Sequence, residues 1–244
     1  MDKEIVSLWN QFEIKFLLCC TKYKQRYEKI VPELARVGIT DYIVQWDVPE
    51  TPIKDILRRN IRVNKFLQDI GPFSCCLSHY KAIKTAQGLG VKSCLIMEDD
   101  IRFRLDIDIL KATLGSLPQD YDYAQFENVK PYEMELGEYL GLKDKNIINK
   151  QWRRFVNLRG GGCYAMSKIA ISRMAEAIED RITGRKGKLK INDRYISKMY
   201  GLNKYFCFPP LAIQKGIGNS NSDVNGYLTN YELLGLKENE YANA

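Results

Sequence analysis

The chain of 244 residues has few of the features that mark secreted proteins, membrane-spanning proteins or proteins stabilised by a structural metal ion. His79 is its single histidine and no Cys-x-x-Cys pair occurs, which argues against a zinc site. The seven cysteines are an odd number and include two adjacent pairs, Cys19-Cys20 and Cys75-Cys76, so we expect reduced thiols rather than a disulfide framework. No apolar run approaches the ~20 residues of a membrane span, and the first residues do not resemble a signal peptide. These absences predict a cytoplasmic protein.

Charge of one sign is only moderately in excess. The 37 Lys and Arg residues against 30 Asp and Glu give a net charge of +7, which fits an anionic substrate, an anionic membrane surface or nucleic acid. The basic residues are scattered and no nucleic-acid recognition motif occurs, so we do not expect nucleic acid as a partner. Hydrophobic residues make up 45% of the chain, which is enough for a core. We expect a single domain over 1–244, with a polar insertion around 130–150 and a polar tail over 225–244.

The most informative stretch is an apolar run that ends in three acids. Residues 93–97 (Ser-Cys-Leu-Ile-Met) predict a strand buried on both faces, and Glu98, Asp99 and Asp100 follow at once. Because burying charge is costly, the acids must lie where the strand leaves the sheet, which is where α/β proteins bind ligands. A hard cation such as Mg²⁺ or Mn²⁺ would relieve the repulsion between them. The alternative is a solvated acidic turn.

The surrounding pattern predicts an α/β fold. Residues 14–20 and 41–46 predict strands on either side of a helix over 22–36, which Pro32 should kink or split. Further helices are expected over 53–68, 74–88 and 169–182, and further strands over 122–126 and 204–213. Strands that alternate with helices in this way are typical of βαβ units.

The helix expected to begin at Ser74 carries His79 and leads directly into the acidic strand. A lone helical histidine most often has a structural role. The competing interpretation is that His79 supports the acids of the site without binding the ligand itself. Gly160, Gly161 and Gly162 precede a short apolar strand, after which Ser167 should cap a helix. Glycines let the backbone approach a ligand closely, or they form a hinge.

Two later stretches suggest contacts with substrate. Residues 181–190 carry five basic residues and predict either a mobile loop that contacts anions or a membrane surface, or a solvated turn. Asn192 and Asp193 then open a helix, where the helix dipole by itself favours an acid.

Four stretches together resemble one protein family. They are Cys75-x-Leu77-Ser78-His79-x-x-x-x-Lys84, Leu95-Ile96-Met97-Glu98-Asp99-Asp100, Gly161-Gly162-Cys163-Tyr164-Ala165-Met166-Ser167, and Pro209-Pro210-Leu211 followed by Ser222-Asp223-Val224. In this order they resemble the family-25 glycosyltransferases, which comprise bacterial lipopolysaccharide and lipooligosaccharide galactosyltransferases and collagen-type galactosyltransferases. The resemblance covers roughly residues 14–224.

The resemblance implies a GT-A-like fold, with a mixed central sheet flanked by helices. It also implies a UDP-sugar donor with galactose favoured, Mn²⁺ or Mg²⁺, inversion at the sugar carbon, and a glycan or glycolipid acceptor. Asp100 and Glu98 would hold the metal, and Asp193 would take the proton of the acceptor hydroxyl. The residues expected to bind the donor are Thr21, Arg26, Ser78, His79, Glu98, Asp99, Gly161, Gly162 and Lys215.

The sequence departs from the family at two places. The turn after the first strand is Cys19-Cys20-Thr21, where the family has an Asn-Leu-Asp type turn followed by two arginines, and only Arg26 matches one of them. A C-terminal histidine that would complete the metal shell does not occur in the sequence. The alternatives are a sugar nucleotidyltransferase and a non-catalytic glycan- or nucleotide-binding protein on the same scaffold.

Overall fold

The computed structural model describes residues 2–47, 70–127, 148–154, 161–183, 185, 196 and 199–214. Its helices are α1 Lys3–Trp9, the 3₁₀ helix η1 Thr21–Tyr23, α2 Lys24–Arg36, α4 Ile70–Leu89, α5 Ile107–Gly115 and α7 Lys168–Ile182. Its strands are β1 Ile14–Cys19, β2 Ile43–Trp46, β3 Ser93–Glu98, β4 Ile101–Phe103, β5 Tyr123–Gln125, β6 Trp152–Arg154, β7 Cys163–Ser167, β8 Lys204–Cys207 and β9 Ala212–Gln214.

Seven strands form one mixed sheet in the order β2-β1-β3-β7-β5-β8-β6, and β4 pairs with β9 in a separate two-stranded sheet. The strands β2, β1 and β3 are parallel to one another, and β7 is antiparallel to both β3 and β5. This confirms the expected α/β fold with a mixed central sheet flanked by helices. The carboxyl ends of β1, β2 and β3 therefore lie along one edge, as predicted for the site.

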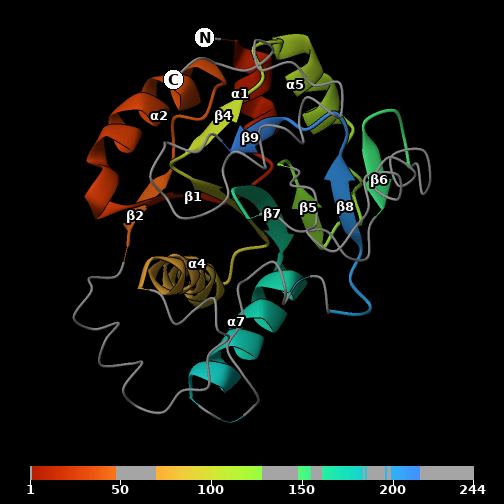
Figure 1. The fold of residues 1–244 in the computed structure, drawn as a ribbon. Coiled ribbons are helices and arrows are strands. Elements are labelled where there is room, and N and C mark those ends of the chain that lie inside the picture. Colours follow the sequence, from red (N-terminus) through yellow and green to blue (C-terminus); the bar gives the residue numbers. More distant parts are fainter. Residues whose placement is uncertain are drawn as a thin grey trace, which may run out of the picture.

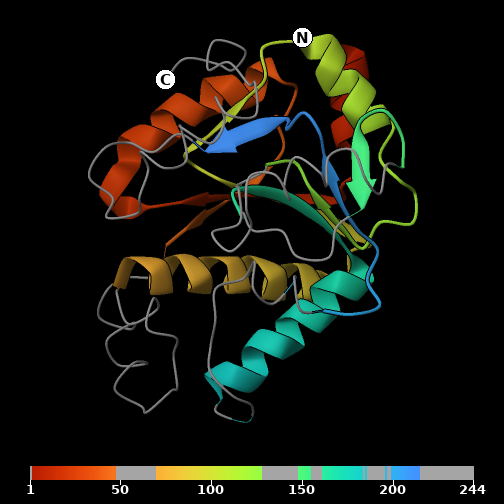
Figure 2. The ribbon, with the colours of Figure 1, turned by 45° about the vertical axis from the view of Figure 1, so that its right-hand side comes forward.

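Helices cover both faces of the sheet. Figures 1 and 2 show α4 and α7 on one face, with α1, α2 and α5 on the other. Each face has its own buried cluster, one built around residues of β1, β3, α4 and α7, and the other around residues of α1, α2, α5 and the opposite side of the same strands. Among the described residues, no helix is long and apolar enough to cross a membrane.

Strand β3 lies inside the sheet between β1 and β7, and Ser93 to Met97 are buried while Glu98 is half-buried. Leu95, Ile96 and Met97 are fully buried, each contributing about 1.5–3 kcal/mol. The prediction of a strand buried on both faces, with acids where it leaves the core, is thus confirmed.

Helix α2 is not split at Pro32, contrary to one outcome expected from the sequence. A proline inside a helix costs about 3 kcal/mol. The apolar side chains of Ile30 and Leu34 lie on the same face as Pro32's neighbour Glu33 and are fully buried. Burial of these two side chains is of the same size as the proline penalty, so packing keeps the helix in one piece.

Three further boundaries differ from the expectations. Helix α4 begins at Ile70, so Ser74 lies inside the helix instead of capping it. The strand expected over 204–213 is two strands, β8 and β9, which lie in different sheets. Pro209 and Pro210 stand between these strands and have no amide hydrogen to donate to a neighbouring strand. Helices α1 and α5 were not expected. The cap at Ser167 is confirmed, since its Oγ accepts a hydrogen bond from the Ala170 amide at 3.4 Å.

Some expectations lie outside the described residues. They include the helix over 53–68, the greater part of the insertion around 130–150 and the tail over 225–244. The assignment of one domain over 1–244 stays a prediction.

Candidate active site

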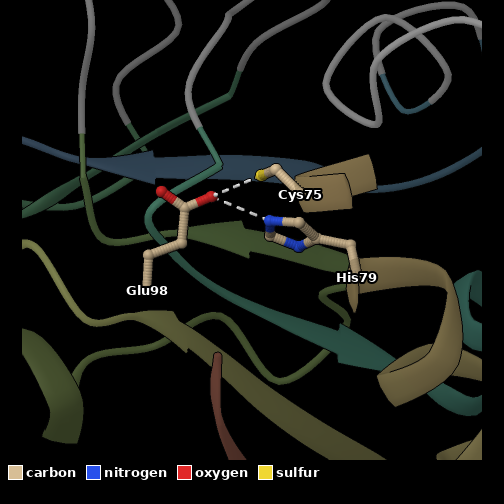
Figure 3. Close-up of side chains that lie close together, drawn as sticks. All are labelled: Cys75, His79 and Glu98. Atoms are coloured by element: carbon tan, nitrogen blue, oxygen red, sulfur yellow. Dashed lines mark hydrogen bonds and ion pairs between the residues drawn. The ribbon is translucent and has the colours of Figure 1, made fainter. Parts of the chain in front are cut away.

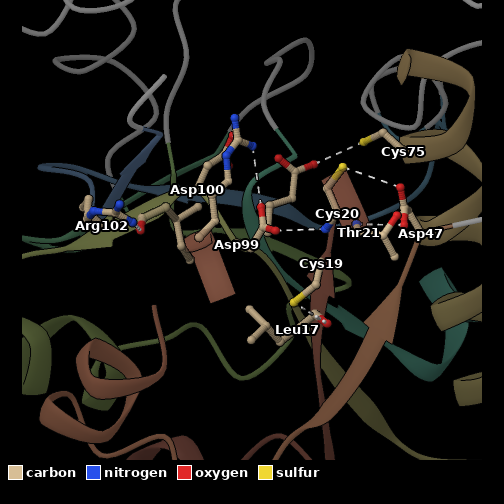
Figure 4. Close-up of polar contacts among 12 residues, drawn as sticks. Leu17, Cys19, Cys20, Thr21, Asp47, Cys75, Asp99, Asp100 and Arg102 are labelled. Atoms are coloured by element: carbon tan, nitrogen blue, oxygen red, sulfur yellow. Dashed lines mark hydrogen bonds and ion pairs between the residues drawn. The ribbon is translucent and has the colours of Figure 1, made fainter. Parts of the chain in front are cut away.

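Polar residues gather where the parallel strands β1, β2 and β3 end. Asp47 follows β2, and its Oδ1 accepts a hydrogen bond from the Thr21 amide at 3.0 Å, just after β1. Its Oδ2 lies 3.5 Å from the Cys20 thiol. Figure 4 shows these contacts beside the acids that follow β3. The loop after β1 is therefore held by a carboxylate from each neighbouring strand, Asp47 on one side and Asp99 on the other.

Arg26, Asp99 and Asp100 form what we call the arginine side of the site. Arg26 comes from the first turn of α2, and its Nη1 lies 3.3 Å from Asp100 Oδ2 and 3.7 Å from Asp99 Oδ1. All three side chains are largely buried, with exposed fractions of 9%, 13% and 6% for Arg26, Asp100 and Asp99. The guanidinium also lies over the Tyr23 ring, 4.3 Å from its centroid, which adds a cation–π contact.

Asp99 is the more deeply buried of the two acids. Its Oδ2 accepts a hydrogen bond from the Cys20 amide at 2.9 Å. Desolvation, with a smaller contribution from the charge of Glu98, raises the pKa of Asp99 to about 6. The Cys20 amide and Arg26 oppose this rise and do not cancel it.

Cys75, His79, Glu98 and Tyr164 form what we call the histidine side. Glu98 Oε1 lies 2.8 Å from His79 Nε2 and accepts a hydrogen bond from the Cys75 thiol at 3.5 Å, as Figure 3 shows. Desolvation acts to raise the pKa of Glu98, but His79, Cys75 and Arg26 together outweigh it and hold that pKa below its ordinary value. Desolvation around the sulfur and the charge of Glu98 raise the pKa of the Cys75 thiol well above its usual range.

The imidazole of His79 is held on both of its nitrogens. Its Nδ1 lies 2.8 Å from the hydroxyl of Tyr164, which comes from β7. The two rings stack with centroids 5.7 Å apart, and Tyr164 stacks in turn on Tyr123 of β5. Tyr164 and His79 are each 2% exposed, and burial raises the pKa of Tyr164 well above its ordinary value. A helix and two strands therefore fix the ring that contacts Glu98.

Of the two described glycines before β7, Gly162 approaches a side chain of the protein closely. The Gly162 amide donates a hydrogen bond to Glu127 Oε2 at 2.7 Å, and a Cβ atom at Gly162 would lie 2.8 Å from that oxygen. A Cβ atom at Gly161 would lie 4.0 Å from His79 Cε1. At Gly162 the need for glycine comes from a buried carboxylate at the end of β5, so the close approach that the sequence predicted is explained without a ligand.

The structure brings together most of the residues expected at the site. Those that meet at this edge are Thr21, Arg26, His79, Glu98, Asp99, Asp100, Gly161 and Gly162. Ser78 instead donates to the Ser74 carbonyl within its own helix, at 3.0 Å. Lys215 and Asp193, and most of the basic loop over 181–190, lie outside the described residues.

Sequence reasoning missed four residues of this edge, namely Asp47, Cys75, Glu127 and Tyr164. One signal was available for Cys75, because positions four apart on a helix share a face and Cys75 precedes His79 by that spacing. Asp47 follows a predicted strand, which the same argument as for the acid triplet would have placed at the edge. The contact between His79 and Tyr164 joins segments 85 positions apart, so no local pattern indicates it.

The expected metal ligands Glu98 and Asp100 point to different partners. Glu98 contacts His79 and Cys75, whereas Asp100 contacts Arg26. Within the described residues, the metal-binding side chains that converge are Cys75, His79 and Glu98, whose ligand atoms all lie within 4.8 Å of one another. The oxygen chemistry of Asp100 fits a hard ion, while Glu98 fits the same ion only if it leaves His79.

Comparison with protein-family models and with curated sequences finds no match. Among solved structures, the chain is similar to a glycosyltransferase involved in glycosylation of the major capsid of PBCV-1, with 9% identity, 88% of this chain and 98% of that chain covered, and a TM-score of 0.43. It is also similar to the glycosyltransferase GlyE of Streptococcus pneumoniae, with 10% identity, 92% and 64% covered, and a TM-score of 0.44. A third is mannose-1-phosphate geranyltransferase from Thermus thermophilus, with 10% identity, 79% and 73% covered, and a TM-score of 0.39. At these identities and TM-scores, the similarities decide neither substrate nor reaction.

Proposed function

We propose that the protein is a GT-A-like glycosyltransferase that moves a hexose, with galactose favoured, from a UDP-sugar to a glycan or glycolipid acceptor with inversion. The observation that carries this proposal is the set of charged groups at the carboxyl ends of β1, β2 and β3. A nucleotide diphosphate offers hydroxyls to carboxylates and anionic oxygens to cations. Asp47, Asp99 and Arg26 provide both kinds of partner within one edge of the sheet.

Arg26 is the residue that we assign to the diphosphate. Its side chain is 9% exposed, and its buried Nε has no hydrogen-bond partner among the residues that the structure describes. Buried donors are nearly always paired in native proteins, so an unpaired one calls for an explanation. An anionic ligand that shifts the guanidinium away from Asp99 would supply the missing partner.

A divalent cation, Mn²⁺ or Mg²⁺, is part of the proposal, with Asp100 as its protein ligand and Glu98 as a second ligand. When bound, such an ion would neutralise the diphosphate of the leaving UDP. Asp100 has the oxygen chemistry that these ions prefer. Glu98 is already engaged by His79, so Asp100 is the better supported of the two as a ligand for this ion.

The acceptor half of the proposal rests on the sequence. Asp193 is the proposed general base, which takes the proton of the acceptor hydroxyl, and Lys215 is proposed to contact the donor. The basic residues of 181–190 are proposed to contact the acceptor or an anionic membrane surface. Synthesis of lipopolysaccharide or another surface glycan is the process that we propose for the enzyme.

A screen of UDP-sugars with Mn²⁺ tests the donor without any knowledge of the acceptor. We expect slow hydrolysis of one UDP-hexose, with release of UDP, and weaker UDP binding in EDTA by calorimetry. A nucleotidyltransferase would instead release pyrophosphate from UTP and a sugar phosphate. A binding protein on the same scaffold would bind UDP without turnover. Either result would overturn the proposal, and equal UDP affinity with and without EDTA would remove the metal from it.

Two substitutions separate the proposed roles. Asp100→Asn should abolish metal-dependent UDP binding and turnover together. Asp193→Asn should leave UDP binding nearly intact and lower transfer by about 10²–10⁴-fold, the range typical for loss of a general base. Glu179→Gln, at the exposed ion pair with Lys84, is the control and should behave as wild type. Near wild-type transfer by a folded Asp193→Asn variant would exclude Asp193 as the base.

A further inference from the structure

We propose that Cys75, His79 and Glu98 form a binding site for a borderline transition-metal ion, with Zn²⁺ the best fit. This site shares Glu98 with the hard-ion site proposed at Asp100 and differs from it in its other ligands and in its preferred ion. The inference does not rest on transferase activity, because it concerns the affinity of the protein for the metal alone.

The spacing of the ligands suits a single ion. Cys75 and His79 lie four positions apart on α4, so both side chains leave the same face of the helix, and Glu98 reaches them from the end of β3. Ligand atoms around a tetrahedral Zn²⁺ lie roughly 3.3–3.8 Å apart, given metal–ligand distances of about 2.0–2.3 Å. The observed separations are 3.5 Å for Cys75 Sγ to Glu98 Oε1 and 2.8 Å for His79 Nε2 to Glu98 Oε1. All three ligand atoms lie within 4.8 Å of one another, so an ion requires shifts of these side chains to reach tetrahedral spacing.

The chemistry of the three donors selects the ion. A thiolate and an imidazole favour Zn²⁺ and similar transition metals over Mg²⁺, which prefers oxygen ligands alone. Three protein ligands leave one coordination position open, as in catalytic zinc sites. The Glu98 side chain is 18% exposed, so water has access to that position.

The surroundings of His79 resemble the outer shell of a metal site. A histidine that binds a metal through one nitrogen normally donates a hydrogen bond from the other, and this fixes its tautomer. The hydroxyl of Tyr164, 2.8 Å from His79 Nδ1, provides that acceptor and leaves Nε2 directed at Glu98. The stacked Tyr164 ring also holds the plane of the imidazole.

Binding would displace a proton, and its fate can be stated. Without metal, the Cys75 thiol donates its proton in a hydrogen bond to Glu98 Oε1. A thiol binds a metal as the thiolate, so the ion takes the place of this proton and releases it to solvent, while His79 binds as the neutral imidazole with its proton on Nδ1. No oxidant or reductant takes part.

The test uses the full chain, stripped of metal and titrated with Co²⁺ and then Zn²⁺. We expect binding of one Co²⁺ per chain with a thiolate-to-cobalt charge-transfer absorption, which Zn²⁺ then abolishes by displacement. An excess of Mg²⁺ should leave the absorption unchanged. Calorimetry in buffers of different ionisation enthalpy should report the released proton.

Matched variants assign the ligands. Cys75→Ser should remove the charge-transfer absorption and weaken binding by at least about 10–100-fold, because a lost ligand costs no less than a lost outer-shell partner. Tyr164→Phe keeps all three ligands and should weaken binding about 10-fold or more while the absorption stays. Cys20→Ser removes a different thiol at the same edge of the sheet, one that contacts Asp47. This variant should leave the Co²⁺ affinity and the charge-transfer absorption unchanged.

Three results would overturn the inference. They are no thiolate absorption with Co²⁺, the same affinity in folded Cys75→Ser, or loss of the absorption in Cys20→Ser. In each case Cys75, His79 and Glu98 would be a hydrogen-bonded cluster that stabilises the turn after β3. Since no readout uses a nucleotide sugar, failure here is distinct from failure of the proposed transferase activity.

Discussion

The arginine side and the histidine side of the site begin at adjacent residues and have opposite electrostatic character. Asp99 is turned toward the Cys20 amide and Arg26, and its pKa is raised to about 6. Glu98 is turned toward His79 and Cys75, and its pKa is lowered. The pKa values of two adjacent acids thus shift in opposite directions, because each side chain contacts a different element of the fold.

Strand geometry explains the divergence. Successive side chains of a strand point to opposite faces of the sheet, and Glu98 is the last residue of β3. It therefore faces His79 and Cys75 of α4, as Figure 3 shows, while Asp99 reaches back to the Cys20 amide at the end of β1 (Figure 4). For Glu98 several partners together outweigh desolvation, whereas for Asp99 desolvation outweighs its partners.

The largest effect on stability is expected from breaking the arginine side. Arg26→Ala leaves two largely buried carboxylates without their guanidinium, and removing one partner of a buried ion pair costs about 3–5 kcal/mol. Urea unfolding followed by circular dichroism would measure this loss. Arg36→Ala on the same helix is the control, because its side chain is 32% exposed and a smaller loss is expected. A loss equal to that of the control would show that Asp99 and Asp100 are well solvated.

A smaller effect is expected on the histidine side. Tyr164→Phe removes one hydroxyl and leaves the buried Nδ1 of His79 without its partner, which should cost about 1–3 kcal/mol. Thermal and urea unfolding would measure the change. Tyr80→Phe, at a half-buried position of α4 next to His79, should stay within about 0.5 kcal/mol of wild type. If both variants unfold alike, the histidine contact does not stabilise the fold.

The smallest effect is a pH dependence at the far end of α2. The Glu33 carboxylate accepts a hydrogen bond from the Phe103 amide and faces Arg36 and Arg102, yet desolvation prevails and raises its pKa. Since the folded-state pKa lies above the unfolded one, the contribution of Glu33 to stability is full below the unfolded pKa. It declines as pH rises through the folded pKa.

Replacing this group should remove that part of the pH profile. We expect the urea midpoint of Glu33→Gln to fall less than that of wild type as pH rises from 4 to 7. A parallel pair of curves would show that Glu33 titrates alike in the folded and unfolded chains.

The sequence predicted much of the frame and part of the site. Local pattern was sufficient for β1, β2, β3 and α7, since each has a continuous apolar run or a buried helical face bounded by a cap. It failed where packing overrides local preference, as at Pro32 inside α2, and where a proline pair moves two short strands into different sheets.

The acid triplet, by itself, determined that charge would lie at the carboxyl edge of β3, because apolar residues fill the strand and charge is costly to bury. Only the tertiary structure decided which partner each acid has. Arg26, His79 and Tyr164 lie 74, 19 and 85 positions from the residues that they contact, and their meeting depends on the order of strands and on the helix covering each face. The chain therefore specifies the acids locally, and the packing of α2 and α4 on opposite faces of the sheet determines what each acid can do.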